Sequence, residues 1–148
     1  MSQTRPVHDL LFAHDFPPMA GGIARWMAAL AQYYPPQALT VSTGMMAGAA
    51  ASDAHFPQSI DRVAVRSERL RTLGGVSRWS RRAVTLARDP AARFAWCDTL
   101  RPSAYPAHWA FRRAGLPYGI MVVGNDLLTL RPKLRRAGPK RAGSWSQR

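Results

Sequence analysis

Two adjacent glycines, Gly21 and Gly22, are the residues of this sequence whose type and surroundings best suit ligand chemistry. A short apolar run, Val7–Phe12, precedes them, and Pro17 and Pro18 exclude a helix between that run and the glycines. Glycine accepts backbone angles and close approaches that a Cβ atom would forbid. An amphipathic helical pattern follows, and its apolar positions share one face: Ile23, Trp26, Met27, Leu30, Tyr33 and Tyr34.

The segment therefore predicts a strand, a glycine turn and a helix, an arrangement that leaves the first N–H groups of the helix without partners. A helix start of this kind attracts phosphate. A second interpretation, a turn that only packs a βα unit, stays open on the glycines alone. NAD is not expected, because no third glycine follows and the run Leu39–Thr43 ends without the acidic residue that would bind a ribose.

Few residues support other kinds of chemistry. The one cysteine, Cys97, and the four histidines have none of the spacings of a metal site, so we expect no metal and no cofactor. Cys97 closes the apolar run Phe94–Cys97 and is expected to be a buried thiol rather than a reactive one. His14 follows the first apolar run, so it either faces a ligand at the glycine turn or is bonded to backbone. No carboxylate pair and no Ser/His/Asp motif indicates hydrolysis.

Alternating strand and helix patterns indicate the elements that must position the glycine turn. Strands are predicted at His8–His14, Ala38–Thr43, Arg62–Arg66, Arg93–Cys97 and Tyr118–Val123. Helices are predicted at Gly22–Tyr34, Val76–Arg88, Ala104–Ala114 and Asn125–Arg136. This order predicts a Rossmann-like α/β fold, a mostly parallel sheet of about five strands with helices on both faces.

Single residues predict several boundaries between these elements. Ser103 is expected to cap the helix over Ala104–Ala114, and Gly115 is expected to end it. The segment Gly44–Ser59, rich in Gly, Ala, Ser and Met, is expected to be a long connection. If the sheet ends with Tyr118–Val123, that strand is an exposed apolar edge and an aggregation hazard.

The helix predicted at Val76–Arg88 carries arginines on its polar side and no acidic residue. Either this side is simply solvated, or it lies against an anionic membrane surface. Both interpretations stay open. The apolar stripe consists of Val76, Trp79, Ala83 and Leu86, and the arginines outside it are Arg78, Arg81, Arg82 and Arg88.

Composition limits the class of protein. The chain has 148 residues, 47% of them hydrophobic, and a formal net charge of +13, which suits one domain that attracts anions. Residues 1–136 are expected to form the domain and residues 137–148 a basic disordered tail. Specific nucleic-acid recognition is not expected, because the basic tail has no interleaved aromatic residues beyond Trp145. Without a signal peptide or an apolar span, we expect a cytoplasmic protein, or one peripheral at the inner face of the membrane.

Several ordered segments carry a family resemblance. The strings FPPMAGGIARWMAALA, LTVSTG, LRPSAYPAHWAFRRAGLPYGIMVVGND and LLTLRPKLRR resemble the N-terminal half of family 4 glycosyltransferases, from about Val7 to about Arg136. The resemblance implies the acceptor-side Rossmann-like domain of a two-domain GT-B fold, here incomplete. It also implies that the N–H groups of Gly21, Gly22 and Ile23 approach the diphosphate of a nucleotide-sugar donor.

The resemblance further implies that two loops complete this side of the cleft, after the fourth and the fifth strand. Arg25 lies one turn into the helix, where it either faces the cleft or simply faces solvent. Asp98 and Asp126 suit either a cleft role or a helix or turn cap. The cleft candidates on the two loops are Asp98, Arg101, Gly124, Asn125 and Asp126.

The sequence departs from the family pattern in two places. Val123 stands where family members usually carry a histidine, so we expect a catalytic contact to be lost and assign no catalytic residue. The family's donor-sugar site contains two glutamates eight positions apart, whereas Glu68 is the only glutamate here. We therefore expect no sugar transfer by this chain alone, and nucleotide-sugar binding only when a C-terminal donor domain is supplied. The expected acceptor is a glycan or a lipid-linked acceptor, and the alternative is a non-catalytic anion- or glycan-binding module.

Overall fold

The order of the strands determines which loops lie together at each edge of the sheet. The computed structural model describes residues 7–122. Its five strands form one sheet in the order β3-β2-β1-β4-β5, and every neighbouring pair is parallel. This arrangement confirms the predicted Rossmann-like α/β class. The strands are β1 (His8–Phe12), β2 (Leu39–Met45), β3 (Ser59–Arg66), β4 (Ala92–Cys97) and β5 (Tyr118–Ile120).

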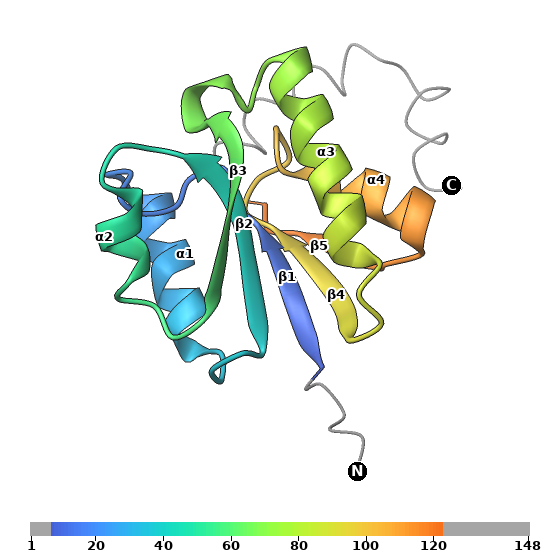
Figure 1. The fold of residues 1–148 in the computed structure, drawn as a ribbon, viewed down its shortest axis with the longest axis horizontal. Helices are drawn as coiled ribbons and strands as arrows, with labels where there is room; N and C mark the ends of the chain where they lie inside the picture. Colours follow the sequence, from blue (N-terminus) through green and yellow to red (C-terminus); the bar gives the residue numbers. More distant parts are fainter. Residues whose placement is uncertain (1–6, 123–148) are drawn as a thin grey trace.

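Helices cover both faces of the sheet, as predicted. Figure 1 shows α1 and α2 on one side of the strands and α3 and α4 on the other. Parallel neighbours need such crossovers, because each strand must return to the same end of the sheet before the next one begins. The helices are α1 (Gly22–Tyr33), α2 (Ala49–Asp53), α3 (Leu73–Ala87) and α4 (Ala104–Ala114), with a short 3₁₀ turn η1 (Ser67–Arg69) before α3.

Strand alternation in β1 divides the core into two layers. Leu10 and Phe12 point to the layer beneath α3 and α4, where Trp79 of α3 packs edge-on against Phe12. Leu11 points to the other layer and packs with Met27 of α1. All five of these side chains are fully buried. Because β1 is central and its second half is buried on both faces, Leu10, Leu11 and Phe12 are apolar without alternation.

The apolar face predicted for α1 is partly wrong. Met27 is buried, but Trp26 is 48% exposed and Tyr33 is 89% exposed. The helix instead presents Ala24 and Ala31 to the sheet. These small side chains let the helix approach closely, so the buried face is rotated away from the large aromatic residues.

Two predicted boundaries are wrong for identifiable reasons. The helix expected from Val76 begins at Leu73, because the Thr72 hydroxyl accepts a hydrogen bond from the Gly75 N–H at 3.1 Å and caps the helix three residues earlier. The segment Gly44–Ser59 is not one long connection, since β2 extends into it, β3 begins at its end and α2 forms within it. Gly115, with φ of 74°, ends α4 as predicted.

Other strand predictions hold with shifted ends. β1 ends at Phe12 rather than His14, β3 begins three residues before Arg62, and β5 ends at Ile120 rather than Val123, since Met121 and Val122 are outside the strand. Cys97 is buried as expected, and burial raises the pKa of its thiol. Within residues 7–122, none of the helices has the length and hydrophobicity needed to cross a bilayer. The expectations for Val123, for a helix at Asn125–Arg136 and for a tail at 137–148 lie outside the described residues.

Candidate functional site

The candidate site lies where the direction of the chain through the sheet reverses. From β1 the chain proceeds to β2 and β3, and it then crosses to β4 on the other side of β1. The loops that follow β1 and β4 consequently leave the same edge in opposite directions. In open parallel sheets, ligands bind in the crevice that forms at this switch point, outside the carboxyl ends of the strands. Residues 13–21 and 98–103 form these two loops.

The glycine turn, Gly21 and Gly22, leaves the start of α1 open. Gly21 precedes the helix at φ 150° and ψ 163°, and no side chain caps the helix. No atom lies within 4 Å of the position that a Cβ would take at either glycine. The first turn contains no acidic residue. The N–H groups of this turn and the positive end of the helix dipole therefore suit an anion.

The side chain of Asp98 holds the loop after β1 in place through hydrogen bonds. Its side chain is fully buried. Its carboxylate accepts hydrogen bonds from the Asp15 backbone N–H at 3.0 Å, from the Thr99 hydroxyl at 3.2 Å and from the Ser103 hydroxyl. Burial raises the pKa of Asp98, and the hydrogen bonds from Ser103 and Asp15 oppose this effect in part. The carboxylate thus joins the two loops of the switch point.

This arrangement corrects the prediction that Ser103 caps α4. Ser103 has helical backbone angles, and its side chain makes no capping hydrogen bond. Its hydroxyl donates to Asp98 instead. A buried carboxylate needs donors, and Ser103 is close enough to supply one.

His14 and Asp15 form a second polar pair at the end of β1. His14 Nδ1 lies 2.7 Å from Asp15 Oδ1, and the His14 residue is only 7% exposed. The hydrogen bond from His14 lowers the pKa of Asp15, and the charges of His14 and Arg71 act in the same direction against the effect of burial. Among the described residues, no hydrogen-bond partner reaches His14 Nε2, which is buried. The side chain of His14 is thus paired with a carboxylate rather than with backbone.

Arg62, which the sequence analysis did not identify, is a second residue that holds the loop after β1 in place. Its guanidinium donates to the carbonyl oxygens of Pro17 and Gly44, the latter at 2.9 Å, and to both carboxylate oxygens of Asp53 at 2.7 and 3.1 Å. It also lies 5.9 Å from the centre of the Phe16 ring. The only signal in the sequence was a charged residue inside a predicted strand. A strand pattern does not reveal which loops that residue meets.

The predicted site residues are distributed as follows. Gly21, Gly22 and Ile23 lie together at the carboxyl edge of the sheet, on the same edge as the loop that contains Arg101. Arg25 and Arg101 are both exposed. The roles assigned to these residues stay predictions. The remaining predicted positions, Val123, Gly124, Asn125 and Asp126, lie outside the described residues.

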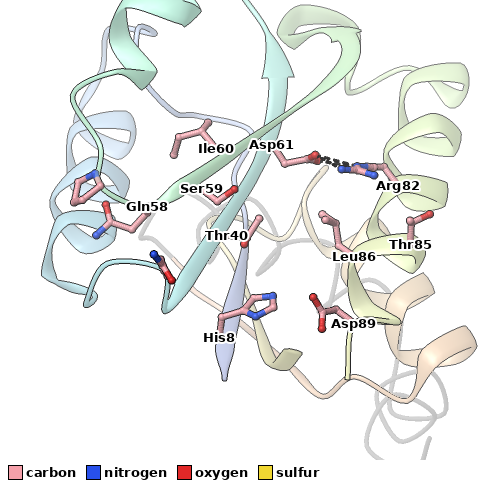
Figure 2. Close-up of a pocket in the computed structure, with 12 residues that line it drawn as sticks. His8, Thr40, Gln58, Ser59, Ile60, Asp61, Arg82, Thr85, Leu86 and Asp89 are labelled. Atoms are coloured by element: carbon pink, nitrogen blue, oxygen red, sulfur yellow. Dashed lines mark hydrogen bonds and ion pairs between the residues drawn. The ribbon is translucent and has the colours of Figure 1, made fainter. Parts of the chain in front are cut away.

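A hollow of about 630 Å³ lies at the opposite end of the strands. Figure 2 shows His8, Thr40 and Asp61 of the sheet facing Arg82 and Leu86 of α3 across it, with an ion pair between Asp61 and Arg82. Because parallel sheets bind ligands at the carboxyl ends of their strands, we do not place the candidate site in this hollow. In the part of the chain that the structure describes, no group of three or more His, Cys, Asp or Glu residues could hold a metal ion.

No protein-family model matches this sequence, and a search of the curated proteins finds no match.

Proposed function

We propose that this chain is the acceptor-side domain of a family 4 glycosyltransferase and that its glycine turn binds the diphosphate of a nucleotide-sugar donor. One observation carries the proposal: an uncapped helix start, open above Gly21 and Gly22, lies beside the switch point of a sheet with the order 3-2-1-4-5. The sequence resemblance described above supports the same assignment.

The proposed chemistry is electrostatic. As a sugar leaves its donor, negative charge accumulates on the diphosphate. N–H groups that already point at this position stabilise the charge without reorganisation. Gly22 and Ile23 supply such groups in the first turn of α1, and Arg25 adds a positive charge in the same turn. No side chain of this chain is assigned as a catalytic residue.

We propose that transfer also requires a donor-binding domain, which would close the reactants into a fixed geometry. The partners are then a nucleotide sugar, bound with that domain, and a glycan or lipid-linked acceptor. An anionic membrane surface is a further proposed partner, because Arg78 and Arg81 of α3 are exposed, as is Arg88 directly after the helix. Leu73, at the start of the same helix, is 92% exposed. Exposed basic and apolar residues together suit the interface of an anionic membrane.

The alternative, a non-catalytic anion- or glycan-binding module, is favoured by Val123 at the usual histidine position. Mixing the chain with a family 4 donor-binding half separates the two. Turnover of a nucleotide sugar supports the transferase, whereas binding of phosphate or glycan without turnover supports the module.

A single methyl group added at Gly22 tests whether the glycine turn binds phosphate. In Gly22→Ala the new Cβ points toward the helix N-terminus, where the phosphate would lie. Since no neighbour lies within 4 Å of this Cβ, the fold tolerates it. We expect Gly22→Ala to weaken binding of inorganic pyrophosphate about tenfold, while the free energy of unfolding stays equal or rises by up to about 1 kcal/mol. Isothermal titration calorimetry and urea denaturation measure the two quantities.

Gly74→Ala is the matched control for this experiment. Gly74 also lies in the first turn of a helix, and its Cβ position is equally open. We expect the control to bind pyrophosphate as the wild type does. Equal affinity in both variants and the wild type would contradict a phosphate site at the glycine turn.

A further inference from the structure

We infer that Arg62 is a positioning residue: from the edge strand β3 it sets the path of the loop that carries the glycine turn. The inference rests on the proposed function in one respect, namely that the glycine turn, held in this position by the loop, binds a phosphate. The geometry of the loop itself stands apart from that purpose and can be measured separately.

The contacts of Arg62 converge on segments that are distant in the sequence. Its side chain is only 9% exposed. The guanidinium reaches Pro17 in the loop after β1, Gly44 in β2 and Asp53 at the end of α2. A planar guanidinium has five donors in a rigid fork, which suits several acceptors at fixed angles. One side chain therefore fixes the relative position of three segments.

The loop transmits this position to the glycines because it is held at its beginning and in its middle. Its beginning is attached to Asp98 through the Asp15 N–H. Its middle is held by Arg62 at the Pro17 carbonyl and by the Phe16 ring, which is buried against Phe56 at a centroid distance of 5.1 Å. Pro18 fixes one φ angle between the Arg62 contact and the turn, and the Met19 N–H donates to the Phe16 carbonyl oxygen at 3.1 Å, which further restricts this segment.

The neighbouring residue on β3 offers a matched comparison. Asp61 points to the opposite face of the sheet and pairs with Arg82 of α3, whose side chain is 44% exposed. Like the Arg62–Asp53 pair, this is an arginine–aspartate ion pair that joins β3 to a helix. It makes no contact with the loop after β1. Loss of Arg82 thus removes the same charge and the same kind of pair without touching the loop.

The experiment compares Arg62→Met with Arg82→Met. Hydrogen–deuterium exchange of residues 15–24 reports the order of the loop, and titration with inorganic pyrophosphate reports the glycine turn. Exchange is measured at equal global stability, adjusted with urea. We expect Arg62→Met to exchange roughly tenfold faster in residues 15–24 and to bind pyrophosphate about tenfold more weakly. We expect Arg82→Met to change neither quantity by more than about twofold.

Arg62→Lys is a second variant, which keeps the test valid if Arg62→Met does not fold. It keeps the positive charge beside Asp53 but loses the fork that reaches Pro17 and Gly44. We expect the same faster exchange in the loop, with a smaller loss of stability. Loop exchange that is no faster in the Arg62 variants than in Arg82→Met would overturn the inference.

Failure of the proposed function gives a different result. If the wild type does not bind pyrophosphate, the phosphate site is wrong, whereas the exchange data still decide whether Arg62 positions the loop. If the wild type binds but Arg62→Met binds equally well, the loop position does not matter to the ligand, and the part of the inference that concerns phosphate binding is overturned.

Discussion

At the scale of single residues, buried charges rather than exposed ones shape the candidate site. Asp98 accepts hydrogen bonds from both loops of the switch point, and Arg62 reaches the same loop from β3. Neither side chain is placed to contact a ligand directly, because both are almost completely enclosed. Their effect is to hold the glycine turn in position before a ligand arrives, which reduces the ordering cost of binding.

The buried carboxyl of Asp98 predicts a specific pH dependence. A carboxyl whose pKa is raised by folding contributes stability below its unfolded pKa, and this contribution is lost as the pH rises through the folded pKa. The pKa of Asp98 is raised from 3.8 by burial. We therefore expect the wild-type free energy of unfolding to fall, relative to that of Asp98→Asn, as the pH rises above 3.8. Urea titrations from pH 3 to pH 7 would measure this difference.

Asp98→Asn is also expected to be destabilised at every pH, since its amide has one acceptor oxygen where the carboxylate has two for the Asp15 N–H and the hydroxyls of Thr99 and Ser103. Loss of one acceptor in this buried network costs about 1–3 kcal/mol. The control is Glu68→Gln, which removes an exposed carboxylate paired loosely with Arg66 at 3.4 Å. A pH-independent difference between the wild type and Asp98→Asn would show that Asp98 keeps its ordinary pKa.

At the scale of elements, α3 has two sides that its sequence pattern separates. Its buried side, which includes Trp79 and Ala83, packs against the sheet and α4. Its exposed side carries arginines and no acidic residue. The helix begins directly after the Thr72 cap, at Leu73, whose side chain is exposed. An apolar tip beside a basic face is the arrangement on which the membrane proposal depends.

The membrane proposal predicts a loss of binding that is specific to this helix. Replacing both Arg78 and Arg81 with Gln should weaken binding to vesicles containing phosphatidylserine by about 1 kcal/mol per arginine, roughly thirtyfold in total. Replacing Arg112 and Arg113 of α4 with Gln removes the same charge from a neighbouring helix and serves as the control. Vesicle sedimentation at physiological salt measures both. Equal losses would indicate a net-charge effect, and no preference for anionic over neutral vesicles would contradict the proposal.

At the scale of the whole molecule, the two core layers differ in what they contain. The layer beneath α3 and α4 includes a buried tryptophan, Trp79, whose indole N–H donates to the Ser42 hydroxyl at 3.0 Å. To the layer beneath α1, this helix contributes only Ala24, Met27 and Ala31 as buried residues, and it leaves Trp26 outside. The apolar pattern of α1 predicted a large contribution from Trp26 to the layer beneath that helix. We therefore expect the layer beneath α3 and α4 to contribute more to the stability of the sheet than this pattern predicted.

Truncating the two tryptophans tests this difference. Trp79→Ala should lower the free energy of unfolding by about 3–5 kcal/mol, because it leaves a cavity in the core. Trp26→Ala should lower it by less than about 1 kcal/mol, because about half of its surface is already in solvent. Chemical denaturation followed by circular dichroism compares the two. Similar losses would place Trp26 in the core, as the helical pattern first predicted.

Several features of this protein follow from its sequence alone. Alternation of apolar strands with helices determined the parallel α/β class, and the Pro-Pro-to-Gly-Gly segment determined a helix start facing a turn. Gly115 determined where α4 ends. These features arise from backbone angles and from residues close together in the chain, so a local pattern is sufficient to predict them.

Only the tertiary structure decided what holds the turn in place. The partners of Asp98 and Arg62 come from loops and helices separated by up to 83 residues, as in the contact between Asp15 and Asp98. Ser103 is close to Asp98 in sequence, yet its side chain serves this carboxylate rather than the helix it precedes. Such pairings depend on how the strands are ordered in the sheet, because the order determines which loops meet at one edge. A one-dimensional pattern of residue types does not contain that order.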